Sequence, residues 1–124
     1  MKNCGMLVGI VSLFLGSWAG ARDGQPLPRD FAVTLKPGKA HEECVSLIEG
    51  AEVAYRFKAS QPVPFNIHFH LGAGPKDPVS YPVKADATTE REEIFRAPVD
   101  QHYCWMWSNK SSGDVSLSGS LAIR

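Results

Sequence analysis

Apolar and polar residues alternate along most of this chain, which indicates β-strands rather than helices. In residues 31–35, for example, Phe31, Val33 and Leu35 alternate with small or polar neighbours. Strict alternation of this kind is typical of strands with one buried and one exposed face. The stretches that show the alternation or a short apolar run are 31–35, 44–48, 53–57, 65–71, 79–83, 92–97, 103–107 and 115–123.

Turn-forming residues separate these stretches, among them Lys36-Pro37-Gly38, Gln61-Pro62 and Ser112-Gly113-Asp114. Short strands with turn signals every 8–12 residues or so are typical of antiparallel sandwiches. We therefore predict an all-β fold, an antiparallel, jelly-roll-like β-sandwich of about eight strands. Pro82 interrupts one stretch and predicts an edge strand, because proline cannot donate to a sheet ladder.

The first 21 residues have the pattern of an export signal. Lys2 supplies a positive charge, residues 6–15 are uncharged and apolar, and Ala19 and Ala21 are the small residues that a signal peptidase requires. The apolar segment is shorter than the roughly 20 residues that a membrane-spanning helix needs. We therefore predict a signal peptide at 1–21, removed during export.

The remaining chain is expected to form one domain, 30–124, preceded by a flexible polar tail at 22–29. The full sequence has 124 residues, with thirteen Lys and Arg and thirteen Asp and Glu; loss of Lys2 leaves a net charge of −1. Near-neutrality argues against a nucleic-acid partner, because such proteins carry a basic surplus. We expect a soluble protein of the periplasm or extracellular space, with no integral membrane segment in the mature chain.

Three cysteines are present, and Cys4 lies in the signal. Cys44 and Cys104 remain, in a compartment where disulfides persist, and they have a single pairing available. A disulfide between them closes a loop of about 60 residues and contributes about 4 kcal/mol in the chain-entropy model. The alternative is a redox-active or metal-binding thiol pair, which the absence of a Cys-x-x-Cys motif disfavours.

Three segments carry a resemblance to a known family. Glu43-Cys44-Val45 opens an early strand, residues 65–69 lead into a Gly/Pro loop, and Tyr103-x-Trp105-x-Trp107-x-Asn109 is followed by a Ser-rich turn and a last strand. Together they resemble the GOLD (Golgi dynamics) domain, a β-sandwich of the lumenal part of small cargo receptors. In that family the late aromatic strand ends in Asn, and several members tie it by a disulfide to the early Glu-Cys strand.

The resemblance implies a non-enzymatic module that binds a protein or a lipid and needs no cofactor. Two features depart from the family pattern. Cys104 lies five residues before Asn109 rather than three, a shift that keeps the same strand face. The sequence also shows no coiled coil, transmembrane helix or cytosolic tail after the domain, so the receptor role as a whole does not transfer.

The aromatic strand itself is a candidate binding surface. If Cys104 faces inward, then Tyr103, Trp105 and Trp107 lie on the other face and form an exposed aromatic stripe, since successive side chains alternate. Tyr and Trp are frequent at interface hot spots. The alternative is that all three are core residues, because large aromatics usually bury.

Histidines provide the rival function, a periplasmic protein that binds copper or zinc. His68 and His70 are two apart in a strand and therefore share a face, where paired imidazoles suit Cu(II) or Zn(II). His102 is a further candidate ligand, with His41 and Met106 as conceivable additions. The alternative is a pair of solvated surface histidines, since spacing fixes only two of the usual four ligand positions.

Acidic clusters at 41–43 and 90–93 are expected to be solvated rather than catalytic, because charge runs beside loops are usually exposed. Asn109-Lys110-Ser111 is an N-glycosylation sequon at an expected accessible turn, relevant only in a eukaryotic secretory pathway. No Gly-x-Ser-x-Gly elbow, phosphate loop or Cys-x-x-Cys motif appears. We therefore do not expect an enzyme.

Overall fold

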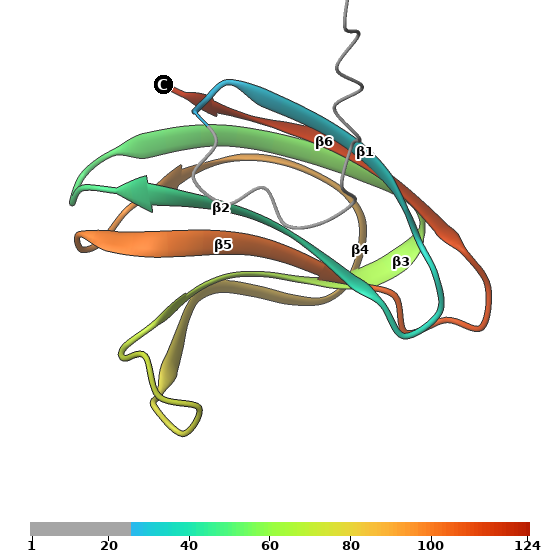
Figure 1. Ribbon diagram of the computed structural model, residues 1–124. Coiled ribbons are helices and arrows are strands. Elements are labelled where there is room, and N and C mark those ends of the chain that lie inside the picture. Colours follow the sequence, from blue (N-terminus) through green and yellow to red (C-terminus); the bar gives the residue numbers. More distant parts are fainter. Residues whose placement is uncertain (1–25) are drawn as a thin grey trace, which may run out of the picture.

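The computed structural model describes residues 26–124, and within that part of the chain every regular element is a strand (Figure 1). All pairings are antiparallel. The six strands are β1 (Arg29–Leu35), β2 (Ala40–Leu47), β3 (Glu52–His70), β4 (Val79–Arg96), β5 (Gln101–Ser108) and β6 (Val115–Ile123). The predicted all-β antiparallel fold is confirmed.

A single sheet curls so that its two halves face each other. The strand order is β1-β6-β3-β5-β2, and β4 pairs with β3 along the outside of this path. β6 pairs with the first half of β3, from Val53 to Ala59, and β5 with the second half, from Phe65 to His68. The result is a first layer of β1, β6 and early β3, and a second layer of β2, β5 and late β3, as Figure 1 shows.

The structure has six strands where the sequence predicted about eight, because two pairs of predicted strands are continuous. The stretches 53–57 and 65–71 join in β3, and 79–83 and 92–97 join in β4. The expected break at Gln61-Pro62 is instead a bend, marked by register shifts between Lys58 and Phe65. Proline is tolerated at such an irregularity because some residues there are unpaired and need no backbone N–H to donate a hydrogen bond to the neighbouring strand. Pro82 does lie in an edge strand, as predicted.

Aromatic side chains from both layers fill the space between them. The Trp107 ring of β5 packs against Phe31 of β1 at 4.9 Å and against Phe57 and Phe65 of β3 at 5.4 Å, measured between ring centroids. Aromatic pairs at such distances add to the free energy of burial. The core therefore ties strands that are far apart in the sequence.

Charged residues close the sandwich where β1 and β2 approach each other. Glu43 is fully buried, with its carboxylate 3.5 Å from Arg29 Nη1 and 3.2 Å from His41 Nε2. Arg29 Nη2 also donates a 2.7 Å hydrogen bond to the carbonyl oxygen of Cys44. The expectation that the 41–43 cluster is solvated is thus wrong for Glu43, because strand alternation directs it inward beside a buried cation.

Asn109 fixes the turns that connect the two layers. Its Nδ2 donates to the carbonyls of Leu35 and Gly113 at 2.9 and 2.8 Å, and its Oδ1 accepts from the backbone N–H and hydroxyl of Ser111. The side chain is 1% exposed. The expected accessibility of this sequon is therefore wrong, since a glycan would replace one of the two Nδ2 hydrogens that bind these carbonyls.

The described part of the chain includes the last residues of the predicted tail, 22–29. β1 begins at Arg29, and Leu27 packs against the core cluster. The predicted signal peptide, 1–21, lies outside the described residues. Within residues 26–124 no helix has the length and apolar character needed to cross a membrane.

Candidate functional site

The predicted disulfide is present and lies on the outer face of the second layer. Cys44 of β2 and Cys104 of β5 are directly opposite each other in the ladder, and their sulfur atoms are bonded. The bridge joins neighbouring strands of one sheet, so neither cysteine has to face the core. This placement decides the orientation of β5, because the residues between its outward positions then face inward.

Tyr103, Trp105 and Trp107 occupy those inward positions, and each is 0% exposed. They therefore do not form an exposed aromatic stripe, and they cannot serve as the binding surface that the sequence analysis considered. Their burial follows from position, since β5 lies between β2 and β3 and its inner face looks into the sandwich. The alternative prediction, that all three aromatic side chains are core residues, is the one that the structure bears out.

The three candidate metal-binding histidines share the outer face of the second layer. His68 of β3 pairs with Cys104 of β5, and its ring lies 5.3 Å from that of His70. His102, on the other side of Cys104 along β5, makes a 3.0 Å hydrogen bond between Nδ1 and Ser46 Oγ. The structure therefore brings His68 and His70 together, whereas His102 is hydrogen-bonded to Ser46 of β2 instead.

Two residues that the sequence analysis did not connect with the histidines complete the surroundings of His68. Asn66 Oδ1 lies 2.7 Å from His68 Nδ1, and Glu42 Oε1 lies 3.5 Å from His68 Nε2. Both could have been found from alternation, since Glu42 is two residues before Cys44 and Asn66 two before His68. Their approach to the same imidazole, however, depends on the order of β2, β5 and β3.

The environment of His68 favours a neutral imidazole. The side chain is only 5% exposed, and burial lowers the pKa of His68, an effect that the Glu42 carboxylate opposes and His70 reinforces. An amide oxygen only accepts hydrogen bonds, so Nδ1 is the donor to Asn66. Glu42 Oε1 lies on the side of the other ring nitrogen, 3.5 Å from Nε2.

In the acidic cluster at 90–93, Glu93 lacks the property that acid catalysis needs. Glu93 is exposed and accepts hydrogen bonds from Arg91 Nε at 2.9 Å and from the Tyr55 hydroxyl at 3.1 Å. The hydrogen bond from Arg91 lowers the pKa of Glu93. A general acid requires a raised carboxyl pKa, which is the opposite of the shift at Glu93.

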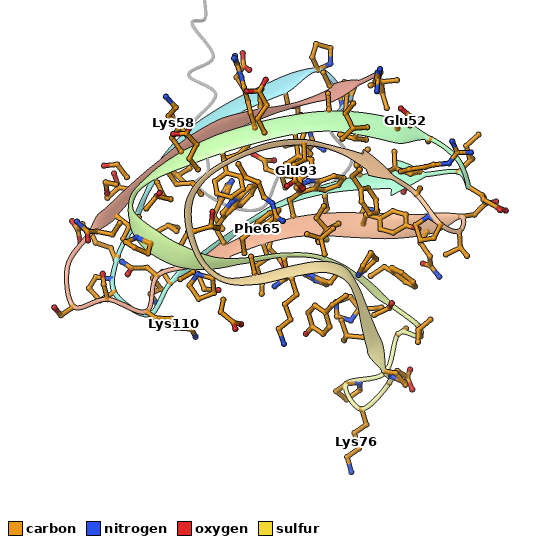
Figure 2. All side chains as sticks on the ribbon, turned by 180° about the vertical axis from the view of Figure 1, so that it is seen from behind. Glu52, Lys58, Phe65, Lys76, Glu93 and Lys110 are labelled. Atoms are coloured by element: carbon orange, nitrogen blue, oxygen red, sulfur yellow. A yellow bond between two sulfur atoms is a disulfide. The ribbon has the colours of Figure 1, made fainter. Side chains whose placement is uncertain are left out.

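The connection between β3 and β4 projects from the sandwich, and Figure 2 shows Lys76 at its tip. Three hydrogen bonds hold it: Leu71 N–H to the Pro78 carbonyl, Asp77 N–H to the Gly74 carbonyl, and Gly74 N–H to the Asp77 carboxylate at 2.7 Å. Exposed apolar residues lie at its base, with Leu71 58% and Tyr81 48% exposed. We call residues 71–81 the projecting hairpin.

Comparison with known proteins identifies the fold and no family. No family model matches the chain, and no curated protein matches it. PliG from Aeromonas hydrophila, a periplasmic lysozyme inhibitor of g-type lysozyme, is similar in structure, with a TM-score of 0.55 at 15% identity over 78% of this chain and 86% of that one.

Two further structures have the same general architecture. The pre-peptidase C-terminal domain of a Bacillus anthracis collagenase gives a TM-score of 0.55 at 14% identity, over 77% of this chain and 89% of that domain. The Yersinia pseudotuberculosis-derived mitogen gives 0.52 at 14% identity, over 81% and 88%. At these identities the likeness establishes a β-sandwich-like fold, and the resemblance to the GOLD family stays a prediction.

Proposed function

We propose that this protein is an exported, non-catalytic module that binds another protein through the projecting hairpin. The observation that carries the proposal is the hairpin itself, which extends beyond the sandwich with an internally hydrogen-bonded backbone and exposed Leu71, Tyr81 and Lys76. Such a segment fits a concave site on a partner better than it encloses a small ligand of its own.

The hydrogen bonds within the hairpin favour tight binding. A loop that already has its bound conformation loses less conformational entropy when it binds. Leu71 and Tyr81 offer apolar anchors, and Lys84 Nζ lies 5.3 Å from the centre of the Tyr81 ring and helps to hold it. Lys76 adds a positive charge at the tip, which suits a partner site with carboxylates.

Export and the partner class are part of the same proposal. The Cys44–Cys104 disulfide fits an oxidising compartment, in agreement with the predicted signal. One structural neighbour is a periplasmic lysozyme inhibitor, a protein that acts by binding an enzyme. A g-type lysozyme is therefore the first partner to test, since glycoside hydrolases carry carboxyl groups in their substrate clefts.

The test uses chain 22–124 with its disulfide intact. Binding to g-type lysozyme and inhibition of its peptidoglycan hydrolysis are measured for the wild type, Leu71→Ser and Lys76→Glu. Each substitution is expected to weaken binding at least about tenfold, which corresponds to about 1.4 kcal/mol. Lys110→Glu is the matched control, because it makes the same charge change in the exposed turn between β5 and β6, away from the hairpin (Figure 2).

Two outcomes would contradict the proposal. If wild type and hairpin variants bind a protein partner equally well, the hairpin is not the contact surface. If the chain binds lipid vesicles but neither lysozyme nor any protein of the exported fraction, the ligand is a lipid rather than a protein.

A further inference from the structure

We propose that the outer face of the second layer holds a site for a borderline divalent metal ion, copper(II) or zinc(II). Its ligands are His68 Nε2, the Glu42 carboxylate and the imidazole of His70. The site lies beside the base of the projecting hairpin, where Tyr81 packs against His68, and it does not require the hairpin to bind a protein. It uses the intact disulfide form of the protein.

The sheet order brings the ligands together. Met106 of β5 lies between Glu42 of β2 and Asn66 of β3 in the ladders, and Cys104 lies between Cys44 and His68. The side chains of Glu42 and His68 therefore meet across β5, with Glu42 Oε1 3.5 Å from His68 Nε2. The two groups come from residues 26 positions apart and are juxtaposed only by the fold.

This separation fits two ligands of one metal ion. Metal–nitrogen and metal–carboxylate bonds of about 2.0–2.2 Å in a tetrahedral site place neighbouring ligand atoms roughly 3.4 Å apart. The observed distance is 3.5 Å. A cation between Nε2 and the carboxylate oxygen would be bound by both atoms.

The second interaction of His68 is also typical of a metal-binding histidine. A ligating imidazole usually donates its other N–H to an oxygen acceptor, which fixes the ring orientation. Asn66 Oδ1 has this position, 2.7 Å from Nδ1. Tyr81 packs against the same ring at 5.9 Å, so the imidazole is held from two sides.

His70 supplies the third ligand. It is exposed, follows His68 on the same strand face, and its ring lies 5.3 Å from that of His68 at an angle of 80°. An exposed side chain can rotate toward the ion without disturbing the core. Two imidazoles and one carboxylate form a donor set that zinc accepts with one further position left for water.

The cysteines define the competing arrangement. Cys104 can approach Glu42 and His68, and Cys44, His102 and Cys104 form a second potential group. In the disulfide neither sulfur is a thiolate, so these groups become strong ligands only after reduction by a dithiol. The two arrangements are distinguished by keeping the disulfide intact and by using His102 as the control.

The experiment titrates Cu(II) and Zn(II) separately into the disulfide-intact chain 22–124, with isothermal calorimetry for affinity and electron paramagnetic resonance for the copper ligands. We expect one ion per chain and hyperfine splitting from two imidazole nitrogens. Glu42→Gln and His70→Ala, both at positions outside the core, should weaken binding at least about tenfold, and His70→Ala should remove one nitrogen from the spectrum. His102→Ala should bind as the wild type does.

His68→Gln should abolish metal binding. Because the His68 side chain is buried, circular dichroism must first show that this variant folds. The Glu42 and His70 variants test the metal site whether or not His68→Gln folds. Unchanged affinity in both of these variants would overturn the proposal. Loss of binding in His102→Ala, or binding only after reduction, would instead assign the metal to the cysteine group and would also overturn it.

Discussion

Arg29 Nη1 lies 3.5 Å from Glu43 Oε2 inside the sandwich, where the pair joins β1 and β2, the first and last strands of the sheet order. The side chains are 3% and 0% exposed. Removing the Glu43 carboxylate takes away the buried anion that faces both Arg29 Nη1 and His41 Nε2 in a poorly solvated place.

Glu43→Ala is therefore expected to lower the free energy of unfolding by about 3–5 kcal/mol, measured by urea denaturation followed by tryptophan fluorescence. The double variant Arg29→Met/Glu43→Leu should lose less, because no charge stays buried. Glu90→Ala, an exposed carboxylate, is the control and should change little. A loss below about 1 kcal/mol for Glu43→Ala would show that the pair contributes little.

Replacing both cysteines should destabilise the fold without changing it. The Cys44–Cys104 bond joins residues 60 positions apart, so the double variant Cys44→Ala/Cys104→Ala is expected to lose about 4 kcal/mol of unfolding free energy. The physical reason is the larger conformational entropy of an unfolded chain without the cross-link. Calorimetric unfolding of the oxidised, reduced and double-variant chains tests this, and equal midpoints in all three would contradict it.

Asn109→Ala should destabilise the turns between the layers. The carbonyls of Leu35 and Gly113 lose their donor, and an unsatisfied buried group costs about 1–3 kcal/mol. We expect a loss of at least about 2 kcal/mol in urea denaturation. Ser111→Ala, which removes only a hydroxyl from the exposed side of the same turn, should lose less; the reverse order would contradict the assignment.

Stability should fall at alkaline pH because of Tyr55. Burial and the nearby Glu93 carboxylate raise the pKa of Tyr55 in the folded state. The unfolded chain releases this proton near the ordinary value of about 10, so the folded state is favoured below that pH and loses stability as the pH rises above it.

Urea denaturation at pH 8 to 11 measures this dependence. Tyr55→Phe should show a smaller decrease above about pH 10 than the wild type, since it has no phenol to ionise. Tyr81→Phe, at an exposed tyrosine, is the control. Identical slopes for the wild type and Tyr55→Phe would contradict the prediction.

Several features of the fold were predictable because their causes are local. Strand alternation identified most of the inward residues of β1 and β6, although Ile123 at the end of β6 is exposed, and it predicted the edge position of Pro82. The disulfide could be predicted because two cysteines lie outside the predicted signal peptide, and only one pairing is available to them. The orientation of β5 could not be predicted, since Trp105 and Cys104 lie on opposite faces and both are commonly buried.

The candidate site was predictable only in part. His68 and His70 share a face in any strand, so their pairing follows from spacing alone. The approach of Glu42 to His68 does not follow from spacing. The two residues lie on β2 and β3, which flank β5 only once the sheet has formed. The burial of Glu43 was likewise not predictable from the sequence. It belongs to a run of charged residues beside a loop, and such runs are usually solvated.

By itself, then, the sequence determined the β class, the alternating faces of the strands, the disulfide partners and the pairing of the two histidines, because each depends on neighbours along the chain. The tertiary structure decided that predicted strands merge into β3 and β4, that Trp105 is buried, that Glu43 pairs with Arg29, and that Glu42 reaches His68. Each of these depends on strand order and register, which are set when distant segments pair and bury their apolar faces together.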